Sequence, residues 1–246
     1  MAEVLLEHND SIAVITINDP ERRNALTIDL SQQLEDKVKQ AEQEANALII
    51  TGAPPGFCAG ADLTQLGSSK DEGLRNIYRG FLAVANATIP TIAAVNGAAV
   101  GAGLNLALAA DVRIAGPKAR FDARFLQLGI HPGGGMTWML QKITNAQTAT
   151  AMTLFGQILD ADQAVACNLA YAKAEDPLAV AKELAKAAAE APGALVRTIK
   201  ATMRKTDAMH DHADAVETEL RPQVASIDTP EFAARLAAMK ARISGR

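Results

Sequence analysis

The segment 91–131 constrains the fold of this chain more than any other part of the sequence. It opens with an apolar run at Ile92–Val95, which is typical of a buried strand. Gly101 and Gly103 follow a break in the pattern and allow a backbone to pass close to a ligand. A nearly all-apolar helix then begins at Leu104. A strand, a glycine turn and a buried helix N-terminus leave backbone N–H groups free to bind negative charge, so this segment predicts an anion site or an oxyanion hole.

Strands and helices alternate around this segment, which indicates an α/β fold. Val4–Glu7 and Ile12–Ile17 predict a hairpin that turns at Asn9-Asp10. Thr27 is the expected N-cap of a helix, and the apolar run Ala47–Thr51 predicts a parallel strand covered on both faces. The other elements expected in this part are a helix at Asp71–Asn86 and short strands at Asp111–Ala115 and Arg120–Asp122.

The character of the sequence changes after residue 135. From Met136 onward helix is expected to follow helix, with only a brief strand at Ala170–Ala174. We therefore predict two regions: an α/β core at 1–135 that carries the site, and a helical region at 136–246.

The composition excludes several classes of protein. A net charge of −4 with no long basic stripe disfavours nucleic acid and anionic membranes as partners. The N-terminus lacks a signal-peptide pattern, and no apolar run reaches the length of a membrane span. Two cysteines make neither a disulfide framework nor a zinc site. These features predict a cytoplasmic protein without a bound metal.

Three other kinds of site are weakly supported. The Gly101-x-Gly103 pair lacks the third glycine of a dinucleotide fingerprint, because Leu106 stands there. Cys58 lies in a GxCxG pattern like a nucleophile elbow, but Pro54-Pro55 separates it from the preceding strand, so a small core residue is the better interpretation. One polar helix face is more typical of solvent exposure than of metal binding; it carries Asp207, His210, Asp211 and Asp214.

Two small-residue turns are more informative together than apart. Phe57–Leu63 and Val95–Asn105 each lead into a helix, and each can leave one backbone N–H without a partner. Two converging N–H groups form an oxyanion hole. The alternative is that both turns are tight for steric reasons alone.

Several segments of this chain, in order and spacing, resemble the crotonase (enoyl-CoA hydratase/isomerase) superfamily. They are Pro20–Leu26 (PERRNAL), Phe57–Leu63 (FCAGADL), Ala93–Gly97 (AAVNG), Gly101–Gly103 and Ala110–Arg113. The resemblance implies a ββα spiral core, a C-terminal helical trimerisation region, and a homotrimer or a hexamer built as a dimer of trimers.

The resemblance also implies an acyl-CoA thioester as ligand. Its carbonyl oxygen is expected on the backbone N–H groups of Ala61 and Ala102, and no separate cofactor is implied because coenzyme A is part of the substrate. The nominal reaction is water addition to a trans-2-enoyl-CoA in fatty-acid metabolism. The residues expected to hold coenzyme A are Arg23, Ala25, Ala59, Asp62 and Leu63, together with Lys200, whose alternative is a solvated helical lysine.

The chain departs from the family at both catalytic carboxylates. Hydratases of this family use two glutamates as general base and general acid. The matching positions here hold Asn105 and Phe125. Asparagine can orient a water but cannot take its proton, and phenylalanine can do neither.

Three interpretations of this loss stay open. In one, Asp122 or His131 replaces the missing base. In another, the protein binds acyl-CoA without chemistry. In the third, it catalyses a reaction that depends mainly on the oxyanion hole, such as thioester hydrolysis or double-bond isomerisation.

Overall fold

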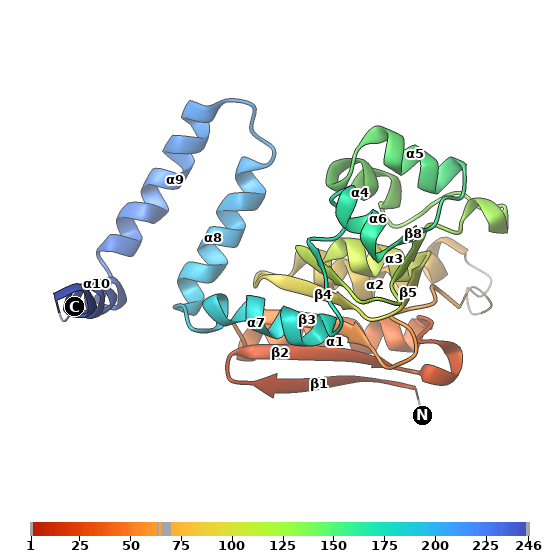
Figure 1. Ribbon diagram of the computed structural model, residues 1–246, viewed down its shortest axis with the longest axis horizontal. Coiled ribbons are helices and arrows are strands. Elements are labelled where there is room, and N and C mark those ends of the chain that lie inside the picture. The colour runs from red at the N-terminus through yellow and green to blue at the C-terminus, as the bar shows by residue number, and fades with distance from the viewer. Residues whose placement is uncertain (1, 63, 65–69, 245–246) are drawn as a thin grey trace. The chain divides into compact units, whose positions relative to one another are not determined.

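The computed structural model describes residues 2–62, 64 and 70–244. The chain forms two compact units, one ending at Ala189 and the other beginning at Glu190. Each unit is described by itself below, and both are drawn in Figure 1.

The first unit is built on a six-stranded sheet in the spatial order β1-β2-β3-β4-β6-β9. The first two strands are antiparallel, and every later pair is parallel. A second sheet has the order β5-β7-β8. The strands are β1 (Glu3–Asn9), β2 (Ile12–Asn18), β3 (Ala47–Gly52), β4 (Thr91–Val95), β5 (Ala98–Val100), β6 (Val112–Ala115), β7 (Arg120–Asp122), β8 (Leu159–Asp160) and β9 (Ala172–Lys173).

Helices cover these sheets. The α-helices of the first unit are α1 (Ile28–Glu44), α2 (Lys70–Asn86), α3 (Ala102–Ala109), α4 (Met136–Ile143), α5 (Ala146–Leu154), α6 (Ala161–Ala166) and α7 (Pro177–Ala189). Two 3-10 turns, η1 (Pro20–Arg22) and η3 (Leu126–Leu128), connect strands to helices.

The N-terminal elements agree closely with the sequence pattern, apart from one turn. The hairpin turns at Asp10-Ser11, one residue later than expected, and Asp10 takes a positive φ of 54°. Thr27 caps α1 as expected, because its hydroxyl accepts a hydrogen bond from the backbone N–H of Leu30 at 3.0 Å.

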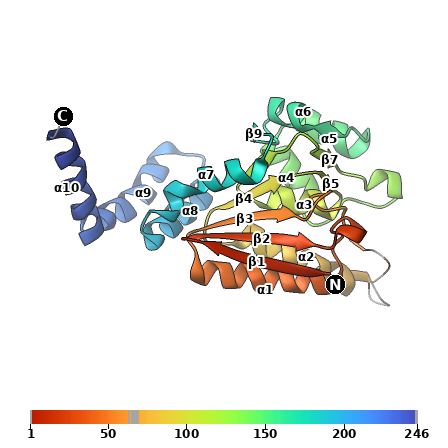
Figure 2. The same cartoon turned by 60° about the horizontal axis from the view of Figure 1, so that its bottom comes forward.

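Alternation along the parallel strands places helices on both faces of the main sheet (Figure 2). Leu48 and Ile50 of β3 belong to the larger core, which contains the apolar face of α1. Ile49, between them, belongs to a second core with Ala181 and Ala185 of α7. The first unit therefore needs α7 to cover its second face, and so it extends well past residue 135.

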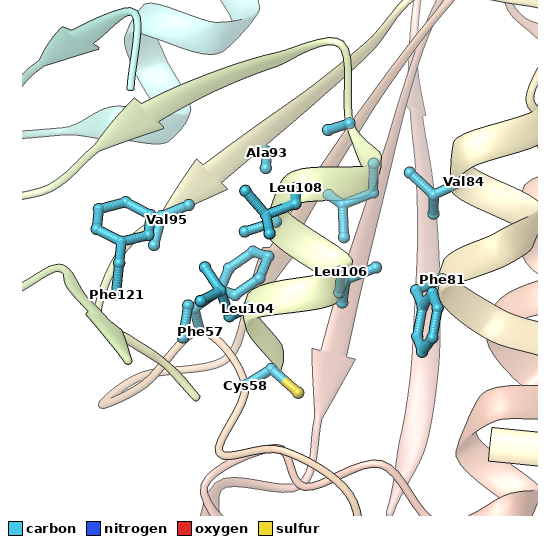
Figure 3. Close-up of a cluster of buried hydrophobic side chains, with 14 of the residues drawn as sticks. Phe57, Cys58, Phe81, Val84, Ala93, Val95, Leu104, Leu106, Leu108 and Phe121 are labelled. Carbon is cyan, nitrogen blue, oxygen red and sulfur yellow. The ribbon is translucent and has the colours of Figure 1, made fainter. Parts of the chain in front are cut away.

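Every residue of helix α3 except Ala109 is buried, as the apolar composition of the helix predicts. Figure 3 shows Leu104, Leu106 and Leu108 packed among side chains from the strands and from α2. The N-terminus of this helix is thereby fixed in the interior, at the end of the short strand β5. The sequence did not predict β5 or β8, because they are only three and two residues long.

The second unit consists of α8 (Gly193–Thr206), α9 (His212–Ile227) and α10 (Pro230–Ser244). Asp211 caps α9 by accepting hydrogen bonds from the backbone N–H groups of Ala213 and Asp214. In the described parts of both units, no helix has the length and apolar character needed to cross a lipid bilayer.

Candidate active site

A cavity of about 360 Å³ is the candidate site of the first unit. It lies among α2, the N-terminus of α3, the loop before Ala61 and the segment 123–133. Its walls are mostly apolar, as is usual for sites that bind small molecules. The lining residues are Ala59, Gly60, Ala61, Leu74, Ile77, Tyr78, Val100, Gly101, Ala102, Asn105, Ala123, Arg124, Phe125, Leu128, Ile130, His131 and Gly133.

Ala61 presents a backbone N–H at this cavity. The flanking groups are both engaged: the Leu26 N–H donates to the Gly60 carbonyl at 2.7 Å, and the Asp62 N–H donates to the Leu26 carbonyl at 2.9 Å. Within the described part of the chain, the N–H of Ala61 itself donates to no protein acceptor. One donor is therefore available to a ligand.

Ala102 supplies a second N–H. It is the first residue of α3, where a helix leaves its N–H groups without intrahelical partners. Gly101 precedes it with φ +53°, and the Gly101 N–H donates to the Asp122 carbonyl at 2.9 Å. Two uncommitted donors at one cavity can bind a single oxygen that carries negative charge.

Glycines allow the two donor segments to pack against each other. A Cβ on Gly60, whose φ is +108°, would lie 2.9 Å from the Val100 carbonyl oxygen and 3.9 Å from the Ala102 nitrogen. A Cβ on Gly103 would collide with the Cys58 carbonyl. Side chains larger than hydrogen at these positions would force the segments apart.

Asn24 holds the loop that leads to Ala61. Its side-chain Nδ2 donates to the carbonyls of Ala53 at 2.7 Å and Gly56 at 2.9 Å, and its Oδ1 accepts from the Asp19 N–H at 2.9 Å. Asn24 is fully buried and takes a positive φ of 61°. One buried amide thus fixes several backbone groups of the loop.

Cys58 is a core residue, as the sequence indicates. It is fully buried, and burial raises the pKa of its thiol to about 12. The thiol stays protonated near neutral pH, so it does not act as a nucleophile there.

Asn105 lies in the first turn of α3 and lines the cavity. It is 1% exposed, and its Nδ2 donates to the Gly133 carbonyl at 3.0 Å. Its Oδ1 is buried and has no hydrogen-bond partner. Phe125, the other residue expected in place of a catalytic glutamate, also lines the cavity. Among the described lining residues, none carries a carboxylate.

The two candidate bases lie in different places. His131 lines the cavity and its Nδ1 is 2.7 Å from the Pro132 carbonyl. A carbonyl can only accept, so Nδ1 carries a proton, and in a neutral imidazole Nε2 is then the nitrogen that can accept one. Asp122 is 3% exposed and pairs with Arg124, and it does not line the cavity.

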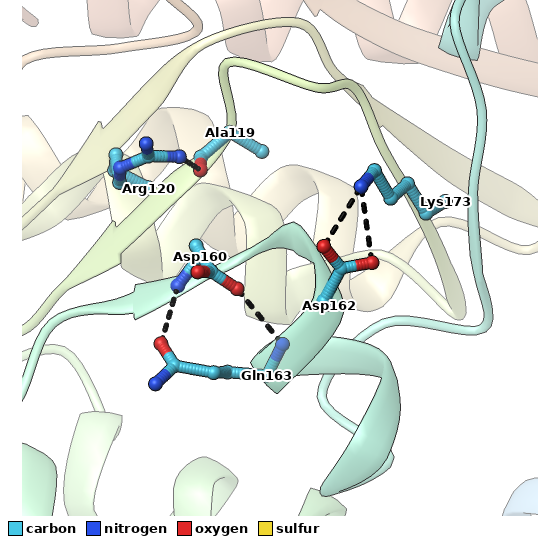
Figure 4. Close-up of polar contacts among 6 residues, drawn as sticks. All are labelled: Ala119, Arg120, Asp160, Asp162, Gln163 and Lys173. Carbon is cyan, nitrogen blue, oxygen red and sulfur yellow. Dashed lines mark hydrogen bonds and ion pairs between the residues drawn. The ribbon is translucent and has the colours of Figure 1, made fainter.

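Asp122 lines a separate hollow of about 490 Å³ instead. Arg120 and Asp160 also line this hollow, and Figure 4 shows the hydrogen bonds that Asp160 makes with Gln163 at the start of α6. Lys173 pairs with Asp162 nearby in the same view. Arg124 and Val100 are the residues shared by the two sites.

The residues expected to hold coenzyme A are spread more widely. Ala59 lines the cavity, and its N–H donates to the carbonyl of the exposed Arg23 at 3.0 Å. Ala25, half-buried, lies between these segments in the chain but is not a lining residue. Leu63 lies outside the described residues, and Lys200 lies on α8 in the second unit.

Asp62 faces Arg22, with a 3.4 Å ion pair, and Thr64. The Thr64 hydroxyl and N–H and the Arg22 charge hold the pKa of the Asp62 carboxyl below its usual value, against the opposing effect of burial. This carboxylate is therefore already paired within the protein, with Arg22 and Thr64.

Tyr78 and Arg124 line the cavity as well, and the sequence did not single them out. Tyr78 lies on the apolar face of α2, where it is indistinguishable from a core residue by spacing. Arg124 has a positive φ of 58°, which no sequence pattern signals.

Comparisons with known proteins show to which family the chain belongs. The sequence model of the enoyl-CoA hydratase/isomerase family matches residues 7–239. The chain belongs to the enoyl-CoA hydratase/isomerase family. A protein of Mycobacterium tuberculosis named as a probable enoyl-CoA hydratase is 52% identical to it, over 97% of this chain and 98% of that protein.

A more distant relative is named for a different reaction. The 1,2-epoxyphenylacetyl-CoA isomerase of Escherichia coli is 35% identical over 72% of this chain and 71% of its own length.

The crystal structure of an enoyl-CoA hydratase from Bacillus anthracis superposes with a TM-score of 0.90, covering 98% of this chain and 96% of that one at 26% identity. The crotonase fold expected from the sequence is confirmed.

Proposed function

We propose that the cavity binds an acyl-CoA thioester with its carbonyl oxygen between the N–H groups of Ala61 and Ala102. The observation that carries this proposal is the pair of uncommitted backbone donors at one apolar cavity. Addition or deprotonation next to a thioester carbonyl develops an enolate, and two such donors stabilise the charge on its oxygen.

The reaction we propose is reversible addition of water to a 2-enoyl thioester, as part of fatty-acid metabolism. Nε2 of His131 is the proposed proton acceptor: it takes a proton from the attacking water, and the imidazolium so formed returns that proton to the α-carbon of the enolate. Histidine is the residue type that exchanges protons near neutral pH. The supporting observation is that His131 lines the cavity while Asp122 is paired with Arg124 in a separate hollow.

The first test is the loss of enone absorbance when the protein meets crotonyl-CoA and a longer trans-2-enoyl-CoA. A parallel calorimetric titration uses butyryl-CoA, which is saturated and cannot react. Turnover at enzymatic rates is the expected result. Binding of butyryl-CoA without turnover of the enoyl-CoA substrates contradicts hydration but is consistent with the acyl-CoA site. If the protein neither binds butyryl-CoA nor turns over an enoyl-CoA, the whole proposal is contradicted.

A substitution tests the donor at Ala102 directly. Ala102→Pro removes the N–H, and proline is well tolerated at the first position of a helix. We expect kcat/KM for crotonyl-CoA to fall about 100-fold or more, the usual effect of removing one such donor. Ala102→Ser keeps the N–H and is the matched control. Equal loss in both variants, or loss in neither, contradicts the assignment.

A second candidate function is acyl-CoA binding without hydration. It is favoured by the absence of a carboxylate from the described lining residues. Double-bond isomerisation and thioester hydrolysis are further reactions that two oxyanion donors support. Product analysis after incubation with 2-enoyl and 3-enoyl thioesters separates these possibilities.

We also propose that the protein assembles as a homotrimer or a dimer of trimers. Helix α9 carries a series of exposed apolar side chains, which are Val216, Leu220, Val224 and Ile227. Such side chains indicate an interface with another chain. Sedimentation equilibrium measures the number of chains, and a monomer at micromolar concentration contradicts this part of the proposal. Roles for Arg23, Asp62 and Lys200 in holding coenzyme A stay predictions.

A further inference from the structure

The C-terminal end of α3 is bound by a buried arginine from β6. Nη1 of Arg113 donates to the carbonyl oxygens of Ala110 at 2.6 Å and Ala107 at 3.4 Å. Ala107 lies in the last turn of α3, and Ala110 is the residue that ends the helix. A helix leaves its last carbonyls without intrahelical partners, so the guanidinium lies where α3 carries its partial negative charge.

Other carbonyls fix the guanidinium in this place. Nε donates to the Leu169 carbonyl at 2.6 Å, and Nη2 donates to the Asp111 carbonyl at 3.4 Å. Arg113 is 7% exposed, and burial lowers its pKa to about 10, while the charge of Asp111 opposes that effect. This pKa is still well above 7, so the side chain carries its positive charge at neutral pH.

The opposite end of the same helix presents the donor at Ala102. Helix α3 begins at this residue, and its eight residues span roughly 12 Å. The helix is packed among apolar side chains (Figure 3), and charges in such surroundings are screened much less than in water. A positive charge at one end of α3 therefore raises the electrostatic potential at the other end.

We propose that the charge of Arg113 strengthens the oxyanion hole from the far end of α3. The guanidinium neutralises the negative end of the helix dipole, so the positive end at Ala102 acts on the ligand oxygen without that opposition. Arg113 touches neither the ligand nor the reacting atoms, and it is a positioning residue that acts through the helix. This inference rests on the proposed acyl-CoA site.

The test measures negative charge on the ligand oxygen and does not require turnover. Acetoacetyl-CoA loses a proton from the carbon between its two carbonyls and forms an enolate that absorbs in the near ultraviolet. Absorbance at pH 8 therefore gives the ratio of enolate to ketone in the bound ligand. The native protein is expected to raise this ratio above its value in free solution, because the two backbone donors stabilise the enolate oxygen.

Two variants that both lose the planar guanidinium isolate the effect of its charge. Arg113→Gln keeps an NH₂ donor for the helix carbonyls but is neutral, whereas Arg113→Lys keeps both donors and charge. A unit charge roughly 12 Å away, at an effective dielectric constant of about 20, changes the enolate ratio about tenfold. We expect that loss in Arg113→Gln and a loss of less than about threefold in Arg113→Lys. Urea denaturation of both variants measures their stability separately.

Asp111→Asn tests the opposite sign of charge at the same end of α3. The Asp111 carboxylate accepts a hydrogen bond from the Thr91 N–H at 2.7 Å, and an asparagine side-chain oxygen can accept it as well. Removal of this negative charge should raise the enolate ratio, though by less than Arg113→Gln lowers it, because Asp111 is exposed to screening by water. If Arg113→Gln does not fold, Asp111→Asn decides, and an unchanged or lower ratio overturns the proposal.

The outcomes separate this inference from the function on which it rests. Equal enolate ratios in Arg113→Gln and Arg113→Lys overturn the role of the charge and leave the acyl-CoA site standing. A native protein that binds acetoacetyl-CoA with the ratio found in free solution overturns the oxyanion hole at Ala61 and Ala102. Failure of the native protein to bind acetoacetyl-CoA overturns the acyl-CoA site itself.

Discussion

The side-chain Nδ2 of Asn105 donates a hydrogen bond to the backbone carbonyl of Gly133 at 3.0 Å. This bond joins the first turn of α3 to the glycine loop that also borders the cavity. A glutamate carboxylate can make no such bond, because it has no donor when ionised. The amide at this position therefore makes a structural contact that an ionised carboxylate cannot make.

Replacement of this amide by a carboxylate is expected to destabilise the protein in a pH-dependent way. Asn105→Asp removes the donor to Gly133 and buries a charge beside a carbonyl oxygen, at a cost of about 2 kcal/mol in the free energy of unfolding at pH 8. Burial raises the pKa of such a carboxyl in the folded state, so stability is regained as the pH falls toward 5. Urea denaturation at both pH values measures this.

The control for that experiment is Asn105→Leu, which also leaves the Gly133 carbonyl without its donor but adds no charge. Its loss of stability relative to the native protein should not change between pH 8 and pH 5. If the two variants lose the same free energy at both pH values, the buried charge has no effect and the expectation is wrong.

Substitution of Gly60 is expected to separate the two backbone donors. In Gly60→Ala the new Cβ meets the Val100 carbonyl oxygen at 2.9 Å, at a residue whose φ is +108°. The loop that leads to Ala61 or the N-terminus of α3 must shift, so we expect kcat/KM for crotonyl-CoA to fall at least about tenfold. Gly135→Ala is the control, because Gly135 also has a positive φ, +83°, but its Cβ meets nothing within 4 Å. Similar activity in both variants contradicts the steric explanation.

The Cys58 thiol is expected to make the fold less stable as the pH becomes alkaline. Its folded-state pKa is raised to about 12, above the ordinary value of 9.0, so the folded protein keeps a proton that the unfolded chain releases. This contribution is complete below pH 9 and is lost as the pH rises toward 12. Between pH 9 and pH 10 we expect the free energy of unfolding to fall by about 1 kcal/mol from this group.

Cys58→Ala isolates that effect, because other groups titrate in the same range. The measurement is the difference between native protein and variant in urea unfolding at pH 8 and at pH 10. The variant starts less stable, since it leaves a small cavity, but it should lose less free energy on going to pH 10. An equal loss in both proteins shows that the thiol does not contribute.

The histidine and the aspartate that are candidates for the base are expected to behave differently. His131→Gln removes the proposed proton acceptor at the cavity, and kcat for crotonyl-CoA should fall about 100-fold. Asp122→Asn should change kcat by about threefold or less, because Asp122 does not line the cavity. It should instead lower thermal stability by weakening the contact with Arg124. A larger loss of kcat in Asp122→Asn than in His131→Gln reverses the assignment.

Much of the fold follows from the sequence, because strong local signals agree with the tertiary structure. Thr27 caps α1, and Ala47–Thr51 forms a buried parallel strand as its uniform apolarity predicts. Short elements escaped prediction: β5 and β8 owe their existence to pairing with β7, which no local pattern encodes. The hairpin turn lies one residue later than predicted. The alternating pattern of the flanking strands does not distinguish between the two turn positions.

The candidate site was predictable only in part. Two small-residue turns predicted that backbone N–H groups would be left unpaired. The resemblance singled out the individual residues Ala61, Ala102, Asn105 and Phe125, all of which line the cavity. Tyr78 escaped notice because an aromatic residue on the apolar face of a helix looks the same whether it packs in a core or borders a cavity. Likewise, nothing in the sequence indicated that Asp122 and His131, nine residues apart, would line different hollows.

The anchoring of the loop by Asn24 has a consequence for the thermodynamics of ligand binding. One buried side chain cross-links the end of β2 to the backbone before Ala61, with four hydrogen bonds to separate main-chain groups. The conformational entropy of this loop is therefore lost when the protein folds, and not when a ligand arrives. A ligand meets a loop that is already ordered, which favours a small entropic penalty on association and a rigid response of the loop to ligands of different shape.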